Sequence, residues 1–215
     1  MKVPFDPYNI LLAGVGGQGI VTVSKILAAA AWKAGFKTSL GEAYGLSQRG
    51  GSVVSHLRIS SHMEPPPLTP DYSTHVLVGL EPAEALRSVK IYGNSDTVVI
   101  VNPELVPTLE ARAGKVDFPD SIELLETLRA LVNTVIEVPA KRLSNRPNQT
   151  VLQNSVMLGA LCGAALFPAA TDGVKKVMPD YLKAGKILDA NLEAFDAGHD
   201  YLANMKSTIL AEQYA

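Results

Sequence analysis

The feature that most constrains the fold is a glycine-rich turn that joins an apolar run to a run of small aliphatic residues. The stretch "ILLAGVGGQGIVTVSKILAAAA" covers residues 10–31. Its glycines Gly14, Gly16 and Gly19 fit the pattern G-x-G-x-x-G, in which a strand passes into a helix. The first glycine permits a tight turn, the second lets a ligand approach the backbone, and the third allows close helix–strand packing. The pattern is typical of an α/β domain whose first helix can face an anion.

The second half of a dinucleotide-binding fingerprint is poorly matched. Such a site needs an acidic residue about 20 positions further on, at the tip of the second strand, to hold a ribose. Glu42 is the only candidate near that position, and we expect it just past a strand. The glycine turn therefore has three interpretations: close packing alone, contact with an anion or cofactor, or dinucleotide binding. The poor acidic partner weighs against the third.

Strand-like and helix-like segments alternate over the first two thirds of the chain. Runs typical of strands occur at residues 8–13, 36–45, 52–60, 75–80, 96–102 and 134–140. A helical pattern covers residues 18–34, and a second, "EPAEALRSVKIY", has Pro82 in its first turn. A third, "DSIELLETLRALVN", has Asp120 or Ser121 as its cap, and its apolar residues at helical spacing are Ile122, Leu125, Leu128 and Leu131. This alternation predicts a Rossmann-like, mostly parallel sheet with flanking helices and right-handed crossovers.

From Asn148 onward the chain has helical patterns, beginning with "TVLQNSVMLGALCGAALF". No internal repeat or low-complexity linker divides the sequence. We therefore predict one domain over residues 1–215, with the α/β sheet at about 8–140 and a helical C-terminal third at about 148–206.

Composition narrows the class of partner. Hydrophobic residues make up 47% of the 215 residues, which is enough for a sizeable core, and the net charge of −2 gives no reason to expect nucleic acid or anionic lipid. The single cysteine, Cys162, excludes an intrachain disulfide and an iron–sulfur cluster held by this chain alone. The longest apolar run, residues 156–170, is shorter than the roughly 20 residues of a membrane span. With no signal peptide at the start, we expect the cytoplasm.

A second unusual stretch is "GLSQRGGSVVSHLRIS". Gly50 and Gly51 allow a sharp reversal of the backbone, and Arg49 beside them can direct a planar guanidinium at a ligand. Ser47 adds a neutral hydrogen-bonding group. Since loops at the carboxyl ends of strands meet in an open α/β sheet, this loop and the glycine turn are expected to be neighbours. The alternative is a bent hairpin with a solvated arginine.

Few other residues form a pattern typical of a catalytic or metal-binding site. The four histidines are scattered, no zinc spacing occurs, and neither a G-x-S-x-G elbow nor a P-loop lysine is found. We expect His75 to be a core or edge residue and Cys162 to be a buried, inert thiol. Asn154 is either a cap near a helix start or a buried polar anchor at an interface. A phosphate contact or a solvated loop would explain the basic residues Lys141, Arg142 and Arg146. Binding features without a catalytic set suggest a subunit whose chemistry lies elsewhere.

Three stretches together, "GVGGQGIVTVSKILAAAAWKAGF", "GLSQRGGSVVSHLRIS" and "NSVMLGAL", resemble the gamma-type domain of 2-oxoacid:ferredoxin oxidoreductases. The form of the second stretch is most similar to the separate beta subunits of the indolepyruvate branch, because the residues before "RGG" usually differ in pyruvate-type relatives. The resemblance covers residues 8 to about 198. The combination of motifs is specific, whereas any one motif alone is weak.

The resemblance implies an accessory subunit in the oxidative decarboxylation of aryl 2-oxoacids, such as indolepyruvate, to aryl-acetyl-CoA, with reduction of ferredoxin. It places thiamine diphosphate, magnesium and the iron–sulfur clusters on a large alpha subunit, with none held by this chain alone. The sequence is consistent with this placement, because "TDG" at residues 171–173 lacks the asparagines of the thiamine diphosphate signature. An isolated chain could form a homodimer. The positions that match the family and could contact CoA or the partner are Gly14, Gly16, Gly17, Gln18, Gly19, Ser47, Arg49, Gly50 and Gly51.

Three other functions remain open at this point. The chain could serve another 2-oxoacid, of the pyruvate or 2-oxoglutarate type, or be a stand-alone nucleotide-binding oxidoreductase with Glu42 as its ribose partner. It could also be a non-enzymatic interaction module, which would expose a large apolar patch and have no ligand cleft beside the glycine loops.

Overall fold

The structure is a computed structural model that describes residues 2–45, 51–106, 119–144 and 150–213, with only the backbone described at 150 and 206–213. The described part contains a sheet of six strands in the order β2-β3-β1-β4-β5-β6. The strands are β1 (Tyr8–Val15), β2 (Lys37–Tyr44), β3 (Ser52–Ser60), β4 (Val76–Gly79), β5 (Val98–Val101) and β6 (Thr134–Glu137).

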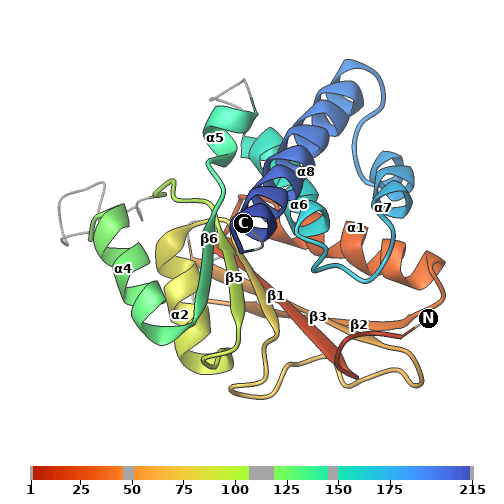
Figure 1. Cartoon of the computed structure of the whole chain (residues 1–215). Helices are drawn as coiled ribbons and strands as arrows, with labels where there is room; N and C mark the ends of the chain where they lie inside the picture. The colour runs from red at the N-terminus through yellow and green to blue at the C-terminus, as the bar shows by residue number, and fades with distance from the viewer. Residues whose placement is uncertain (1, 46–50, 107–118, 145–149, 214–215) are drawn as a thin grey trace.

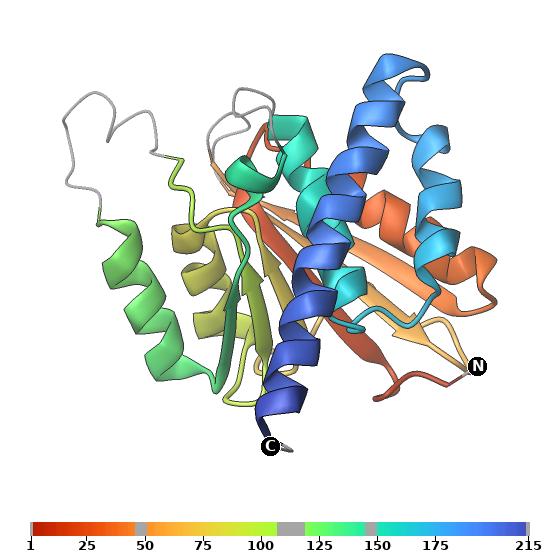
Figure 2. The same cartoon turned by 45° about the horizontal axis from the view of Figure 1, so that its top comes forward.

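Helices cover both faces of the sheet (Figures 1 and 2). The face that carries α1 (Ile20–Lys33) is also covered by α6 (Thr150–Gly163), α7 (Thr171–Val177) and α8 (Lys186–Gln213). The opposite face carries α2 (Pro82–Tyr92) and α4 (Ser121–Leu131). Two short elements complete the described chain, namely α5 (Ala140–Leu143) and the 3₁₀ turn η1 (Met178–Asp180).

The central parallel strands β4 and β5 are apolar throughout, and β1 is mostly apolar, because both faces of these strands are buried. In β1, Ile10 and Leu12 face the large core beneath α1, α6 and α8, whereas Leu11 faces the smaller core beneath α2 and α4. The parallel neighbours β4 and β5 divide their side chains between the same two cores. The predicted α/β class with a helical C-terminal part is therefore confirmed.

One strand departs from the parallel arrangement. β3 is antiparallel to both β1 and β2 and lies between them. The connection from β2 to β3 covers only residues 45–51, and a crossover to a parallel strand needs about a dozen residues or more. A hairpin is therefore the only arrangement open to these two strands, and β2 becomes the edge of the sheet.

Glycines set the distance between the two main helices of the C-terminal part. A methyl group added at Gly159 or Gly163 of α6 would collide with the backbone of α8 at Phe195 and His199. A methyl group at Gly198 of α8 would collide in the same way with Val156 of α6. The helices therefore pack backbone against backbone, and α6 is held firmly in place beside the glycine turn.

Several details differ from the sequence predictions. The first helix begins at Ile20, so Gln18 belongs to the turn and not to the helix. Asp120 is the cap of α4, where its carboxylate accepts a hydrogen bond from the Glu123 N–H at 2.8 Å. Among the apolar residues at helical spacing in α4, Leu125 and Leu128 are buried but Ile122 and Leu131 are exposed. Within the described residues, no helix is long and apolar enough to cross a membrane.

Candidate functional site

The glycine turn lies at the carboxyl ends of β1 and β4, where the chain order of the sheet reverses. The chain leaves β1 toward α1, β2 and β3 on one side and leaves β4 toward α2 and β5 on the other. Leu80, just after β4, donates its N–H to the carbonyl of Ala13 at 2.8 Å, so the two strand ends are joined. In open α/β sheets this reversal point is where ligands bind.

Gln18 holds the turn closed from inside. Its side-chain oxygen accepts a hydrogen bond from the Val15 N–H at 2.6 Å, and its amide nitrogen donates to the Leu80 carbonyl at 3.3 Å. Gly14 leaves room for this arrangement, because a Cβ there would lie 2.6 Å from the Gln18 side-chain oxygen and would displace it. Gln18 is buried, so it shapes the turn and ties it to β4 from within the molecule.

The glycines at the end of the turn have left-handed backbone conformations. Gly17 has a φ of 98° and is exposed at the apex, where an added Cβ would meet nothing within 4 Å. Gly19 has a φ of 91° and is the N-cap residue of α1, which has no side-chain cap. The first N–H groups of a helix have no partner within the helix, so this end of α1 is suited to an anion.

The second loop meets the turn as predicted. Gly16 donates its N–H to the Gly51 carbonyl at 2.7 Å, which joins the end of β1 to the start of β3. Ser47, Arg49 and Gly50 lie outside the described residues. Their predicted contacts with a ligand or partner therefore stay predictions.

Asn154 is a residue whose position the sequence left open. It lies within the second turn of α6, past the helix start, with 8% of its surface exposed, so the cap interpretation is wrong. Its side-chain amide donates a short hydrogen bond to the Gln18 carbonyl. An added Cβ at Gly19 would lie 2.8 Å from the same amide nitrogen. Asn154 therefore anchors the helical part to the glycine turn, a contact between residues 136 positions apart.

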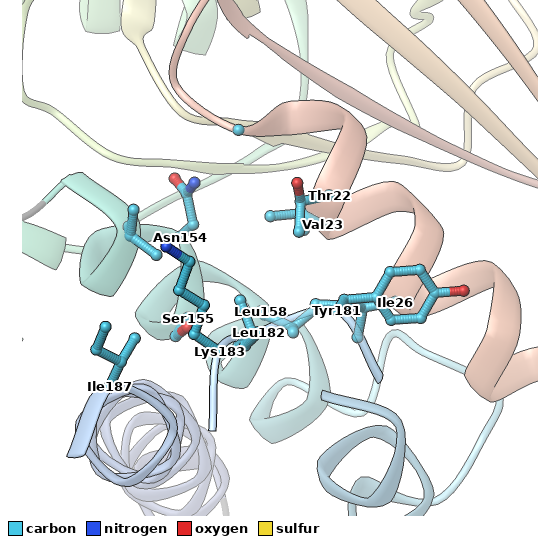
Figure 3. A pocket seen from close by; sticks show the side chains of 12 residues that line it. Thr22, Val23, Ile26, Asn154, Ser155, Leu158, Tyr181, Leu182, Lys183 and Ile187 are labelled. Carbon is cyan, nitrogen blue, oxygen red and sulfur yellow. The ribbon is translucent and has the colours of Figure 1, made fainter. Parts of the chain in front are cut away.

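A cavity of about 340 Å³ opens directly beside the turn (Figure 3). Its three walls come from α1, from α6 and from the segment between η1 and the start of α8. The lining is mostly apolar and consists of Gly19, Thr22, Val23, Ile26, Val151, Asn154, Ser155, Leu158, Tyr181, Leu182, Lys183 and Ile187.

Two buried acids stand on the other side of the turn, at the start of α2. Glu81 is 1% exposed and caps α2 by accepting the Glu84 N–H at 2.9 Å, and Glu84 is 3% exposed and pairs with Arg87. Within the described part of the chain, one oxygen of each carboxyl group has no hydrogen-bond partner. Burial, reinforced by the neighbouring Glu84, raises the pKa of Glu81 to about 7. The sequence "EPAEALR" indicates a helix start but not this burial.

Glu42 is not placed to hold the ribose of a dinucleotide bound at the glycine turn. Glu42 lies inside β2, not just past it, and its exposed carboxylate bonds to the Tyr44 hydroxyl. In the dinucleotide-binding fold the second strand is the neighbour of the first, whereas here β3 lies between β1 and β2. Glu42 is therefore displaced by a full strand from the glycine turn.

Two of the remaining polar candidates, Lys141 and His75, have structural partners. Lys141 and Arg142 lie in α5, where both are exposed and Lys141 pairs with Glu104 at 2.6 Å, and Arg146 is outside the described residues. His75 accepts a hydrogen bond from the Asn9 N–H at 3.0 Å and stacks on Phe5.

Cys162 is buried in α6, and its burial raises the pKa of the thiol to about 12, as expected for an inert cysteine. Among the described residues, no three His, Cys, Asp or Glu side chains form a group that could hold a metal ion.

The fold and this site define an open-sheet α/β domain with a glycine turn at its reversal point, braced by a helical C-terminal part. Residues 9–201 match the family model described as pyruvate ferredoxin/flavodoxin oxidoreductase. The chain belongs to this family.

Alignments with named relatives extend over most of the chain. It is 36% identical over 192 residues to the indolepyruvate oxidoreductase subunit IorB of Archaeoglobus fulgidus, an alignment that covers 89% of this chain and 94% of the relative. A pyruvate oxidoreductase subunit PORC from Thermotoga maritima has the same fold, with a TM-score of 0.65, 21% identity, and coverage of 91% of this chain and 97% of that chain.

A further similar structure places the same fold inside a longer chain. The 2-oxoglutarate:ferredoxin oxidoreductase from Magnetococcus marinus, solved with 2-oxoglutarate, coenzyme A and succinyl-CoA bound, gives a TM-score of 0.68 at 23% identity. The match covers 94% of this chain but 32% of that chain. In that protein the fold of this chain is therefore one part of a larger polypeptide.

Proposed function

We propose that this chain is the small subunit of an indolepyruvate-type, that is aryl 2-oxoacid, ferredoxin oxidoreductase and that it is not active alone. The similarity to a subunit named for indolepyruvate, at 36% identity over 89% of the chain, carries the proposal. The complex would oxidise and decarboxylate the aryl 2-oxoacid to an aryl-acetyl-CoA and reduce ferredoxin. Thiamine diphosphate, magnesium and the iron–sulfur clusters would belong to the large subunit.

In this proposal the glycine turn is a rigid backbone surface that the partner subunit or CoA approaches. Four attachments support the rigidity: Gln18 to Val15 and Leu80, Gly16 to Gly51, and Asn154 to the carbonyl of Gln18. The exposed apex at Gly17 has no side chain, so another backbone or a phosphate can come close. Arg49, Gly50 and Ser47 would extend this surface.

The test is co-expression with the candidate large subunit. A tag on this chain should bring down the large subunit with its thiamine diphosphate and clusters, and the complex should reduce ferredoxin or a viologen with indolepyruvate and CoA. Activity of this chain alone with the same substrates would contradict the subunit role. Failure of the two chains to associate would contradict the assembly.

The second candidate is a small subunit for pyruvate or 2-oxoglutarate, because structures named for those substrates share the fold. Comparing indolepyruvate, pyruvate and 2-oxoglutarate at equal concentration in the complex separates the candidates. A stand-alone nucleotide-binding protein is disfavoured because β3 separates Glu42 from the glycine turn. Titration of the chain with NAD(H) and FAD tests it, since stoichiometric binding would favour that alternative.

A further inference from the structure

The cavity beside the glycine turn has the properties of a small-molecule site that the proposed role has not yet used. Its volume of about 340 Å³ falls at the lower end of the range of about 300 to 1,000 Å³ that is typical of ligand pockets. Val23 and Ile26 of α1 face Leu158 of α6 across it, so its walls are apolar. The space suits a compact apolar body of one or two rings and is too small for a dinucleotide.

Positive charge is concentrated at one part of this cavity. Lys183 has no acidic partner among the described residues, and in Figure 3 its side chain reaches across the cavity with the amine toward Asn154. The uncapped start of α1 at Gly19 lines the same cavity and adds the positive end of a helix of 14 residues. A single anionic group is the natural complement of one ammonium and one helix end.

We propose that this cavity binds an arylalkyl monocarboxylate, with its carboxylate between Lys183 and the start of α1 and its ring between Val23, Ile26 and Leu158. The choice of an aryl acid rests on the proposed function, because an enzyme for aryl 2-oxoacids would meet acids of this class as substrates and related products. The described residues that line the cavity include no carboxylate, imidazole or thiol. In this proposal the site binds the acid and carries out no reaction on it.

Indole-3-acetate is the probe, titrated into the full chain by calorimetry if circular dichroism shows it folded alone and otherwise into the co-purified complex. Lys183→Met removes the positive charge, and Thr22→Phe fills part of the cavity with a ring from the α1 wall. Lys176→Met on α7 is the matched control, because Lys176 is an exposed lysine outside the cavity. We expect one molecule bound per chain, affinity about tenfold weaker or worse in both cavity variants, and no change in the control.

Three results would overturn the inference: no saturable binding to the unmodified protein, equal binding in all variants, or acetate binding as tightly as indole-3-acetate. CoA that binds here and is not displaced by indole-3-acetate would also overturn it, since the site would then belong to a different ligand. Turnover of indolepyruvate by the complex is measured separately. A complex that is active but does not bind indole-3-acetate at this cavity rejects the inference and leaves the proposed function intact.

Discussion

The buried acid Glu81 should make the stability of this protein fall as the pH rises from about 4.5 to about 7. Burial raises its pKa from an ordinary 4.5 to about 7, so the folded state keeps a proton that the unfolded state has already lost between these values. Stability that is fully present below pH 4.5 is therefore lost progressively up to about pH 7. Each pKa unit corresponds to about 1.4 kcal/mol, which gives a loss of about 3 kcal/mol.

Glu81→Gln tests this reasoning because glutamine keeps an oxygen for the Glu84 N–H but cannot ionise. Urea unfolding of the unmodified chain and of the variant would be measured from pH 4.5 to pH 8.5. The difference in free energy of unfolding should move by about 3 kcal/mol in favour of the variant over this range, whatever constant cost the new amide group adds. Glu126→Gln, which removes an exposed carboxylate on α4, is the matched control. A flat difference for Glu81→Gln would refute the reasoning.

Three further predictions follow from the packing. Gly159→Ala should lower the free energy of unfolding by about 3 kcal/mol or more, because the added methyl group would collide with the Phe195 backbone. Gly173→Ala on α7 is the matched control: its methyl group has open space, so the free energy of unfolding should rise by up to about 1 kcal/mol, and thermal unfolding measures both variants. Asn154→Ala should cost about 1 to 3 kcal/mol and increase hydrogen exchange at the glycine turn, because the Gln18 carbonyl loses its donor; unchanged exchange would contradict the anchor role. Cys162, with its pKa raised to about 12, should not react with a thiol reagent at pH 8 until urea unfolds the chain; rapid labelling of the folded chain would contradict its burial.

The local parts of the site could be predicted from the sequence because their signals are local. A glycine turn between an apolar run and a helical run fixes a strand–turn–helix unit, and Gly50-Gly51 after a strand indicates a reversal near it. The contact between Gly16 and Gly51 confirms that the two loops are neighbours. The pairing of β3 between β1 and β2 was missed as a specific arrangement, although the short connection at residues 45–51 contains the signal.

The contacts between distant segments could not be predicted, because the role of each residue in them depends on which element packs against it. An asparagine at position 154 could cap a helix or anchor the glycine turn, and the sequence is the same in both cases. Only the packing of α6 beside the turn shows that it is an anchor. Glu81 and Glu84 look like an ordinary acidic helix start, and their burial arises from the packing of α2 on the sheet. The cavity combines three segments that are far apart in the sequence, so no single motif could indicate it.

The central claim is that this chain acts only as part of an aryl 2-oxoacid:ferredoxin oxidoreductase. The most direct measurement is reduction of ferredoxin with indolepyruvate and CoA by the chain alone, the large subunit alone, and the two purified together. We expect full activity only for the pair, with indolepyruvate preferred over pyruvate and 2-oxoglutarate. Equal activity of the large subunit without this chain, or activity of this chain by itself, would contradict it.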